Sequence, residues 1–276
     1  MNIFKIIDQL GNLGTTSSQT QAQTRRESLF GFENVGNLLG KFAAPAAVLA
    51  VAPTVSYGRT AETVIEVLNF ALTLEYLEFS FYTDGLASGI ISSADSAIFN
   101  QIKKHEGDHV SFLKNTINSL GGTPVASPVF DFTAKGTFNP FGSYSDFLAL
   151  SQGFEDTGVR AYKGQAGNLM GNNEVLTAAL QIHSVEARHA SQVRRLRNKN
   201  GFDATNKAWI TGNSRGTMPA ATQAIYDGAT SEANTTQGGV NLTSISSLPI
   251  DTIQEAFDEP LTKAEVLAIV GLFIMK

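Results

Sequence analysis

The chain contains no cysteine, and this absence excludes thiol catalysis, disulfide bonds and cysteine-ligated zinc or iron–sulfur sites. An excess of one charge is also missing: 20 basic and 25 acidic residues give a net charge of -5, so we expect no nucleic-acid partner. The apolar run at residues 42–55 is too short for a bilayer, which requires about 20 apolar residues, so we predict no integral membrane span. Any metal site must therefore use carboxylates and imidazoles, which suit iron, manganese or zinc.

Histidine is rare as well, and its positions are informative. The chain has four histidines, and all of them lie in two windows, residues 102–110 and 182–190. Each window contains Glu-x-x-His, and the second pair follows the first after 80 residues, from position 106 to position 186. The two pairs are Glu106 with His109 and Glu186 with His189. On a helix, positions i and i+3 lie on one face, so each pair directs a carboxylate and an imidazole toward one point.

Two further carboxylates precede these pairs. Glu75 lies upstream of the first pair and Glu155 upstream of the second, and each is followed seven residues later by a tyrosine, Tyr82 or Tyr162. Seven residues make about two helical turns, so each glutamate shares a helix face with its tyrosine. The stripe that carries Glu75 is mostly apolar, and burial of a carboxylate without a partner is costly, so we expect a cation beside it.

A four-helix bundle with a Glu on each of two helices and Glu-x-x-His on the other two is the arrangement of ferritin-like di-iron and di-manganese proteins. The sequence resembles this superfamily over about residues 60–200, and it looks most like bacterial ferritin-like proteins related to plant desiccation-related proteins. The resemblance implies an all-α fold, a ferritin-like four-helix bundle with one long crossover between its second and third helices. Residues 123–141, which include three prolines, fit this crossover.

The resemblance also implies a site for two metal ions, iron first, with manganese or zinc as alternatives. The expected ligands are Glu75, Glu106, His109, Glu155, Glu186 and His189. One histidine is expected to bind each metal, the glutamates of the Glu-x-x-His pairs to bridge them, and the two upstream glutamates to be terminal ligands. Tyr82 and Tyr162 are predicted as catalytic residues that donate hydrogen bonds or electrons, with simple core packing as the alternative.

Three residues leave alternatives open for the ligand set. Glu78 shares the stripe of Glu75 and stays an alternative ligand. His105 lies about 100° round the helix from Glu106, which favours a supporting or surface position over ligation. His183 lies at the edge of its stripe and is the weakest of the histidine candidates.

The sequence predicts three segments: an N-terminal extension at 1–58, the bundle at 59–200 and a C-terminal appendage packed on the bundle at 201–276. We expect the first bundle helix to run from about Thr60 to Gly85. The appendage is expected to be mostly irregular and to end in a short helix that Thr262 and Glu265 open as a capping box.

The N-terminal extension admits two interpretations. Arg25 and Arg26, followed by the apolar residues 42–55, resemble a twin-arginine export signal. An ordinary helix packed on the bundle is the alternative. A periplasmic or other extracytoplasmic location and a cytoplasmic one therefore both stay open.

The leading functional hypothesis is a ferroxidase or peroxidase-type oxidoreductase that consumes dioxygen or peroxide in stress protection. One alternative is a structural or desiccation-related bundle whose site is empty or holds a single metal. A manganese catalase-like enzyme is the other, because the fold supports several chemistries and does not select one. A homo-oligomer is compatible with each of them.

Overall fold

The computed structural model describes residues 63–275 of the chain. The predictions for the N-terminal extension, including the export signal and its alternative as a packed helix, lie outside this range.

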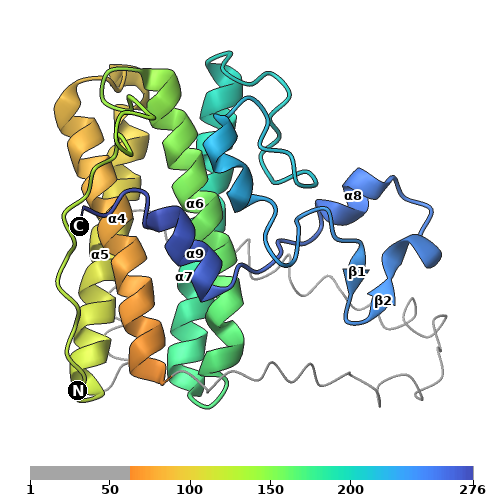
Figure 1. The fold of residues 1–276 in the computed structure, drawn as a ribbon, viewed down its shortest axis with the longest axis horizontal. Coiled ribbons are helices and arrows are strands. Elements are labelled where there is room, and N and C mark those ends of the chain that lie inside the picture. Colours follow the sequence, from red (N-terminus) through yellow and green to blue (C-terminus); the bar gives the residue numbers. More distant parts are fainter. Residues whose placement is uncertain (1–62, 276) are drawn as a thin grey trace, which may run out of the picture. The chain divides into compact units, whose positions relative to one another are not determined.

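Four long helices form the body of this part of the chain (Figure 1). They are α4 (Val64–Ser88), α5 (Ser93–Ser119), α6 (Tyr144–Ala166) and α7 (Asn173–Lys199). The pairs α4–α5 and α6–α7 share the most extensive contacts, and α4 also packs on α6. The predicted all-α four-helix bundle is therefore confirmed.

The ends of α4 differ from the prediction. The helix begins at Val64 with Thr63 as its N-cap, in a capping box with Glu66, and it continues past Gly85 to Ser88. Gly89 then ends it in the left-handed conformation, with φ of 75°. Gly85 lies inside the helix, at a position where a Cβ would overlap the ring of Phe147 on α6. Its glycine reflects close helix packing and not a helix end.

The connection between α5 and α6 is the long crossover that the sequence predicts. It spans residues 120–143 and runs along the bundle from the end of one helix to the start of the other (Figure 1). The C-terminal end of the chain is hydrogen-bonded to it: the amide of Asp131 donates to the carbonyl of Phe273 at 2.7 Å, and the amide of Met275 donates to that of Val129 at 2.9 Å. This pairing covers the exposed backbone of the crossover.

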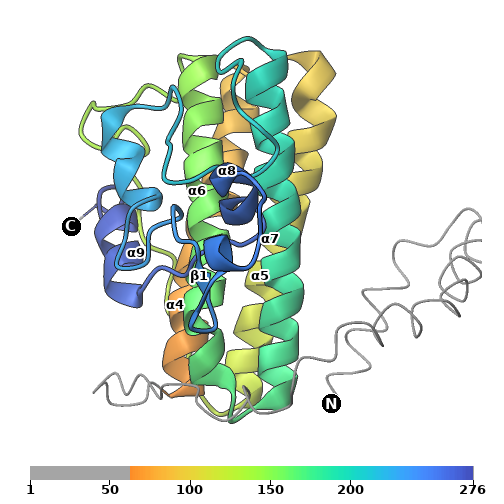
Figure 2. The same cartoon turned by 90° about the vertical axis from the view of Figure 1, so that its right-hand side faces the viewer.

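The C-terminal segment is mostly irregular, as predicted, with short elements along it. A turn of 3₁₀ helix, η1 (Gly167–Leu169), follows α6 within the bundle. The elements of the tail are η2 (Ala220–Ile225), β1 (Thr236–Gln237), β2 (Val240–Asn241), η3 (Leu242–Ser244), α8 (Ile250–Gln254) and α9 (Lys263–Val270). The antiparallel pair β1–β2 was not expected, whereas Thr262 and Glu265 do open α9 as a capping box. Figure 2 shows the tail against one side of the bundle, where η2 and α9 contact α6.

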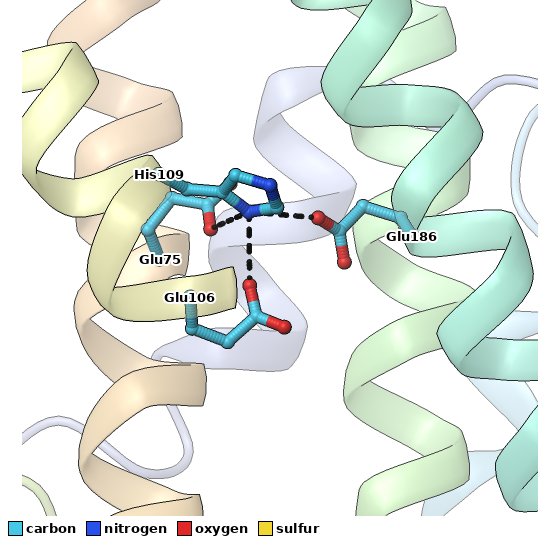
Figure 3. A group of neighbouring side chains, drawn as sticks. All are labelled: Glu75, Glu106, His109 and Glu186. Carbon is cyan, nitrogen blue, oxygen red and sulfur yellow. Dashed lines mark hydrogen bonds and ion pairs between the residues drawn. The ribbon is translucent and has the colours of Figure 1, made fainter. Parts of the chain in front are cut away.

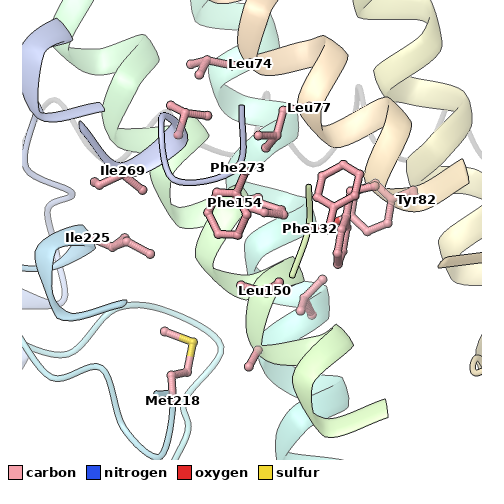
Figure 4. Packing of buried hydrophobic residues seen from close by; sticks show 14 of the residues in the cluster. Leu74, Leu77, Tyr82, Phe132, Leu150, Phe154, Met218, Ile225, Ile269 and Phe273 are labelled. Atoms are coloured by element: carbon pink, nitrogen blue, oxygen red, sulfur yellow. The ribbon is translucent and has the colours of Figure 1, made fainter. Parts of the chain in front are cut away.

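Apolar side chains form two buried clusters. The first is rich in aromatic rings and includes side chains from the bundle, from Phe132 of the crossover, and from Met218, Ile225, Ile269 and Phe273 of the tail (Figure 4). The second lies within the bundle and includes Val67, Leu72, Leu113, Ile117 and Val175. The tail therefore completes the hydrophobic core.

Among residues 63–275, no helix combines the length and the apolar character that a membrane span requires.

Candidate metal centre

The six predicted ligands come together in the middle of the bundle, between the two apolar clusters. On α4, Glu75 lies between Leu72 of the second cluster and Phe81 of the first. On each of the other three helices, too, the predicted ligands lie between residues of the first cluster and residues of the second. The layer between the clusters is largely enclosed, with 12% of the His109 side chain and 6% of the His189 side chain exposed. The four ligand carboxylates are fully buried, with 0% of their residue surface exposed.

Three carboxylates surround the imidazole of His109. Its Nδ1 lies 3.1 Å from Glu75 Oε2, 3.0 Å from Glu106 Oε2 and 3.2 Å from Glu186 Oε1 (Figure 3). These carboxylates come from α4, α5 and α7, so the group joins three helices. One imidazole nitrogen carries at most one proton and cannot donate to three acceptors at once.

His189 has a matching environment. Its Nδ1 lies 2.9 Å from Glu106 Oε1, 3.3 Å from Glu155 Oε2 and 3.6 Å from Glu186 Oε2. The atoms are close but are not aligned for hydrogen bonds. Several buried polar atoms therefore have no hydrogen-bond partner in the described part of the chain: His189 Nδ1, Glu106 Oε1, Glu155 Oε2 and both carboxylate oxygens of Glu186.

The two groups share Glu106 and Glu186, with one oxygen of each carboxylate directed to each histidine. In each group, four ligand atoms lie within 4.8 Å of one another and are buried. Buried polar atoms without partners are rare because each costs desolvation free energy. A pair of cations between the carboxylates and the imidazoles would satisfy all of them, so the donor set fits two metal ions.

Protons neutralise the cluster when metal is absent. Burial raises the pKa of Glu75 to about 8 and also raises the pKa of Glu155. Burial alone would lower the pKa values of His109 and His189. The negative charges of the neighbouring carboxylates outweigh this effect, so both pKa values rise. The largest of these contributions comes from Glu75 for His109 and from Glu155 for His189. The pKa of Glu186 is lowered despite its burial, because both imidazoles face it.

Tyr82 and Tyr162 hold the outer oxygens of two carboxylates. Tyr82 on α4 donates a hydrogen bond to Glu155 Oε1 on α6, and Tyr162 on α6 donates one to Glu75 Oε1 on α4, at 2.5 Å. Burial and the adjacent carboxylate raise the pKa of each phenol, so both stay protonated donors. The two hydroxyls therefore fix the carboxylates whose other oxygens face the histidines.

The remaining histidines lie outside the two groups. His105 packs its ring on that of His189, with centroids 5.1 Å apart, and its Nδ1 lies 2.8 Å from His189 Nε2. Gln101, one turn away, contacts the other nitrogen of His105 at 2.6 Å. A partner on the outer nitrogen of a ligating histidine orients the ring, and His105 is placed to do this for His189. His183 belongs to neither group.

Sequence reasoning placed His105 off the ligand stripe but did not find its partner. The i, i+4 spacing of Gln101 and His105 is the only local signal for their contact, whereas the contact with His189 joins residues 84 positions apart. Glu78, the alternative to Glu75, is buried beside the cluster but lies outside both groups of four.

The comparison with known families agrees with this geometry. A family model described as a ferritin-like domain matches residues 63–199, which run from the N-cap of α4 to the last residue of α7. This part of the chain belongs to the ferritin-like superfamily. A comparison with curated proteins gave no significant match. The ferritin-like domain thus coincides with the four helices that supply the buried donors.

Proposed function

We propose that the ferritin-like domain binds two metal ions, iron foremost, and oxidises ferrous iron at the expense of dioxygen or peroxide. The observation that carries this proposal is the pair of buried four-ligand groups that share Glu106 and Glu186. Four carboxylates and two neutral imidazoles balance the charge of two divalent ions, which removes the cost of burying the carboxylates.

The residues divide between two positions. His109 and Glu75 would hold one ion, His189 and Glu155 would hold the other, and Glu106 and Glu186, which belong to both groups, would serve both ions. Iron bound there would supply the capacity to pass electrons to an oxygen species.

The surrounding side chains prepare the site for this chemistry. Tyr82 and Tyr162 hold the terminal carboxylates in place, and the two apolar clusters exclude water from the layer. Because the imidazoles and Glu75 hold protons when metal is absent, metal binding releases protons from the cluster.

Ferrous iron is the simplest source of electrons. The chain has no cysteine and therefore no rubredoxin-type iron site of its own. Two ferrous ions that become ferric supply two electrons, which with two protons reduce one hydrogen peroxide to two water molecules. This reaction would remove both ferrous iron and peroxide, which fits a role in stress protection.

An oxidation assay tests the proposal. The protein is loaded anaerobically with ferrous iron, and ferric absorbance is followed after addition of dioxygen or peroxide. We expect fast oxidation by the unaltered protein and by Glu174→Ala, which removes an exposed carboxylate of α7, and background oxidation by the double variant Glu106→Ala, Glu186→Ala. Equal rates in all three proteins would contradict the proposal. Fast peroxide consumption with manganese alone would point to the catalase-like alternative.

A further inference from the structure

The two halves of the bundle repeat their functional residues at a constant spacing. Positions 75, 82, 106 and 109 hold the same residue types as positions 155, 162, 186 and 189, each 80 residues later. Beside these residues, one buried carboxylate of the first half has no counterpart in the second. Glu78 on α4 corresponds to Gly158 on α6, so a carboxylate in the first half is matched by the absence of a side chain in the second.

Gly158 provides the room that Glu78 occupies. A Cβ at Gly158 would lie 3.2 Å from Glu78 Oε1, so that carboxylate would have to shift by a few tenths of an ångström, whereas its 3.6 Å distance to Glu186 Cγ is ordinary contact. Glycine inside a helix costs about 1 kcal/mol relative to alanine. Gly158 lies inside the continuous helix α6, so no turn or helix end requires a glycine at this position. The close approach of Glu78 accounts for it instead.

Glu78 lies near the oxygen of Glu186 that faces His189. Its Oε1 and Glu186 Oε2, the oxygen that faces His189, both lie near the Cβ position of Gly158, the second at 3.8 Å. Glu78 is only 2% exposed, so its carboxylate has little access to solvent.

The His189 position differs from the His109 position in a second way. His105 contacts the outer nitrogen of His189, whereas the residue that corresponds to His105 in the second half is Val185, which has no polar side chain. Glu78 and His105, which have no counterparts in the second half, therefore both lie beside residues of the His189 group.

We infer that Glu78 is a seventh protein ligand, which serves the metal ion at the His189 position and makes the two positions unequal. This inference rests on the proposed function. Four carboxylates suffice for two divalent ions, and a fifth adds negative charge that favours tighter binding and a higher metal oxidation state at the His189 position.

Calorimetric titration with Mn²⁺ tests the inference. His109→Ala and His189→Ala assign each binding step to a position. We expect two separate Mn²⁺-binding steps in the titration of the unaltered protein. Glu78→Gln should weaken the His189 step about tenfold or more and leave the His109 step unchanged. Gly158→Ala should act in the same direction, because its methyl group displaces the Glu78 carboxylate.

Matched variants serve as controls. Glu174→Gln changes an exposed carboxylate, and Gly167→Ala adds a methyl group where no atom lies within 4 Å, so neither should alter the titration. Thermal unfolding without metal checks the fold of Glu78→Gln, which should be at least as stable as the unaltered protein because it removes a buried acid from a carboxylate cluster.

The outcomes separate the two proposals. If the unaltered protein binds no Mn²⁺, the proposed function fails and the inference fails with it. If the unaltered protein binds two ions but Glu78→Gln behaves like Glu174→Gln, only the inference is overturned. Equal affinities of the two positions, or an equal loss at both in Glu78→Gln, would also overturn it.

Discussion

At the scale of single residues, the hydroxyls of Tyr82 and Tyr162 connect the two halves of the bundle. Each belongs to one of the helices α4 and α6 and donates to a carboxylate on the other. Because each tyrosine serves a different histidine group, the two hydroxyls should act on different metal positions.

Removal of one hydroxyl should therefore weaken one metal position. We expect Tyr82→Phe to lower Mn²⁺ affinity about 10–100-fold at the His189 position and Tyr162→Phe to do the same at the His109 position. Calorimetric titration measures both steps. Tyr144→Phe is the control, because the hydroxyl of Tyr144 donates to Asp95 outside the centre, at 2.9 Å. Unchanged affinities in both site variants would show that the tyrosines only fill the core.

Protons bound by the metal-free cluster should make its properties depend on pH. The folded-state pKa of Glu75 is about 8, against an ordinary 4.5, and the pKa values of both site histidines are also raised. The stability that these groups contribute is therefore present at low pH and is lost as pH rises, from 4.5 to about 8 for Glu75 and from 6.5 upward for the two histidines. The pKa of Glu186 is lowered, so its contribution to stability is lost as pH falls and not as it rises. That contribution changes only below pH 4.5.

We therefore predict that metal-free protein melts at a lower temperature at pH 8 than at pH 5.5. Metal affinity should change in the opposite direction, because fewer protons must be displaced at high pH. Scanning calorimetry with and without Mn²⁺ checks both points: the stabilisation by metal should widen as pH rises. A stabilisation that narrows over this range would show that the cluster does not exchange protons for metal.

At the scale of helices, the close contact between α4 and α6 depends on Gly85 as well as Gly158. A methyl group at Gly85 would overlap the ring of Phe147, which also stacks on Phe81 with ring centroids 5.0 Å apart. This contact lies in the aromatic-rich cluster, beyond the ligand layer.

Gly85→Ala should therefore destabilise the protein by overpacking, even though alanine favours helix. We expect a loss of about 1–3 kcal/mol in the free energy of unfolding, measured by chemical denaturation. Gly167→Ala, at an uncrowded position with negative φ, should be neutral or slightly stabilising. A stable Gly85→Ala variant would mean that Phe147 has room to move.

Helix periodicity accounts for what the sequence predicts well. The apolar stripes and the spacing of Glu75, Glu106, Glu155 and Glu186 place the donors on inward faces. The end of α4 was predicted wrongly, because a glycine that packs against another helix looks locally like a glycine that ends one. The role of Gly158 needed the contact with Glu78, which no local pattern contains.

At the scale of the molecule, a buried arginine of the bundle binds the C-terminal segment through hydrogen bonds and an ion pair. Arg160 on α6 is fully buried, its Nε lies 2.7 Å from Glu232 Oε1, and its guanidinium donates to carbonyls of the tail, including that of Glu259 at 2.8 Å. Gly164 leaves space for the backbone of Leu261 against the same helix. These contacts join residues 65–99 positions apart, so no sequence pattern predicts them.

Loss of this arginine should release the tail. Arg160→Ala leaves Glu232 buried without its partner, and we expect a loss of about 3–5 kcal/mol in the free energy of unfolding. Limited proteolysis should then cut the tail faster than in the unaltered protein. Arg195→Ala removes an exposed arginine of α7 and should change neither property. Resistance to protease equal to that of the control would show that the tail is held by its apolar contacts alone.

The central claim is that the bundle holds a two-metal centre, and metal content tests it most directly. Protein purified without chelators is analysed by mass spectrometry beside the double variant Glu106→Ala, Glu186→Ala. We predict about two metal ions per chain, iron foremost, and their loss in the double variant. No stoichiometric metal even after anaerobic ferrous loading, with the variant as stable as the unaltered protein, would contradict the claim and leave a structural bundle with a vestigial ferritin-like site.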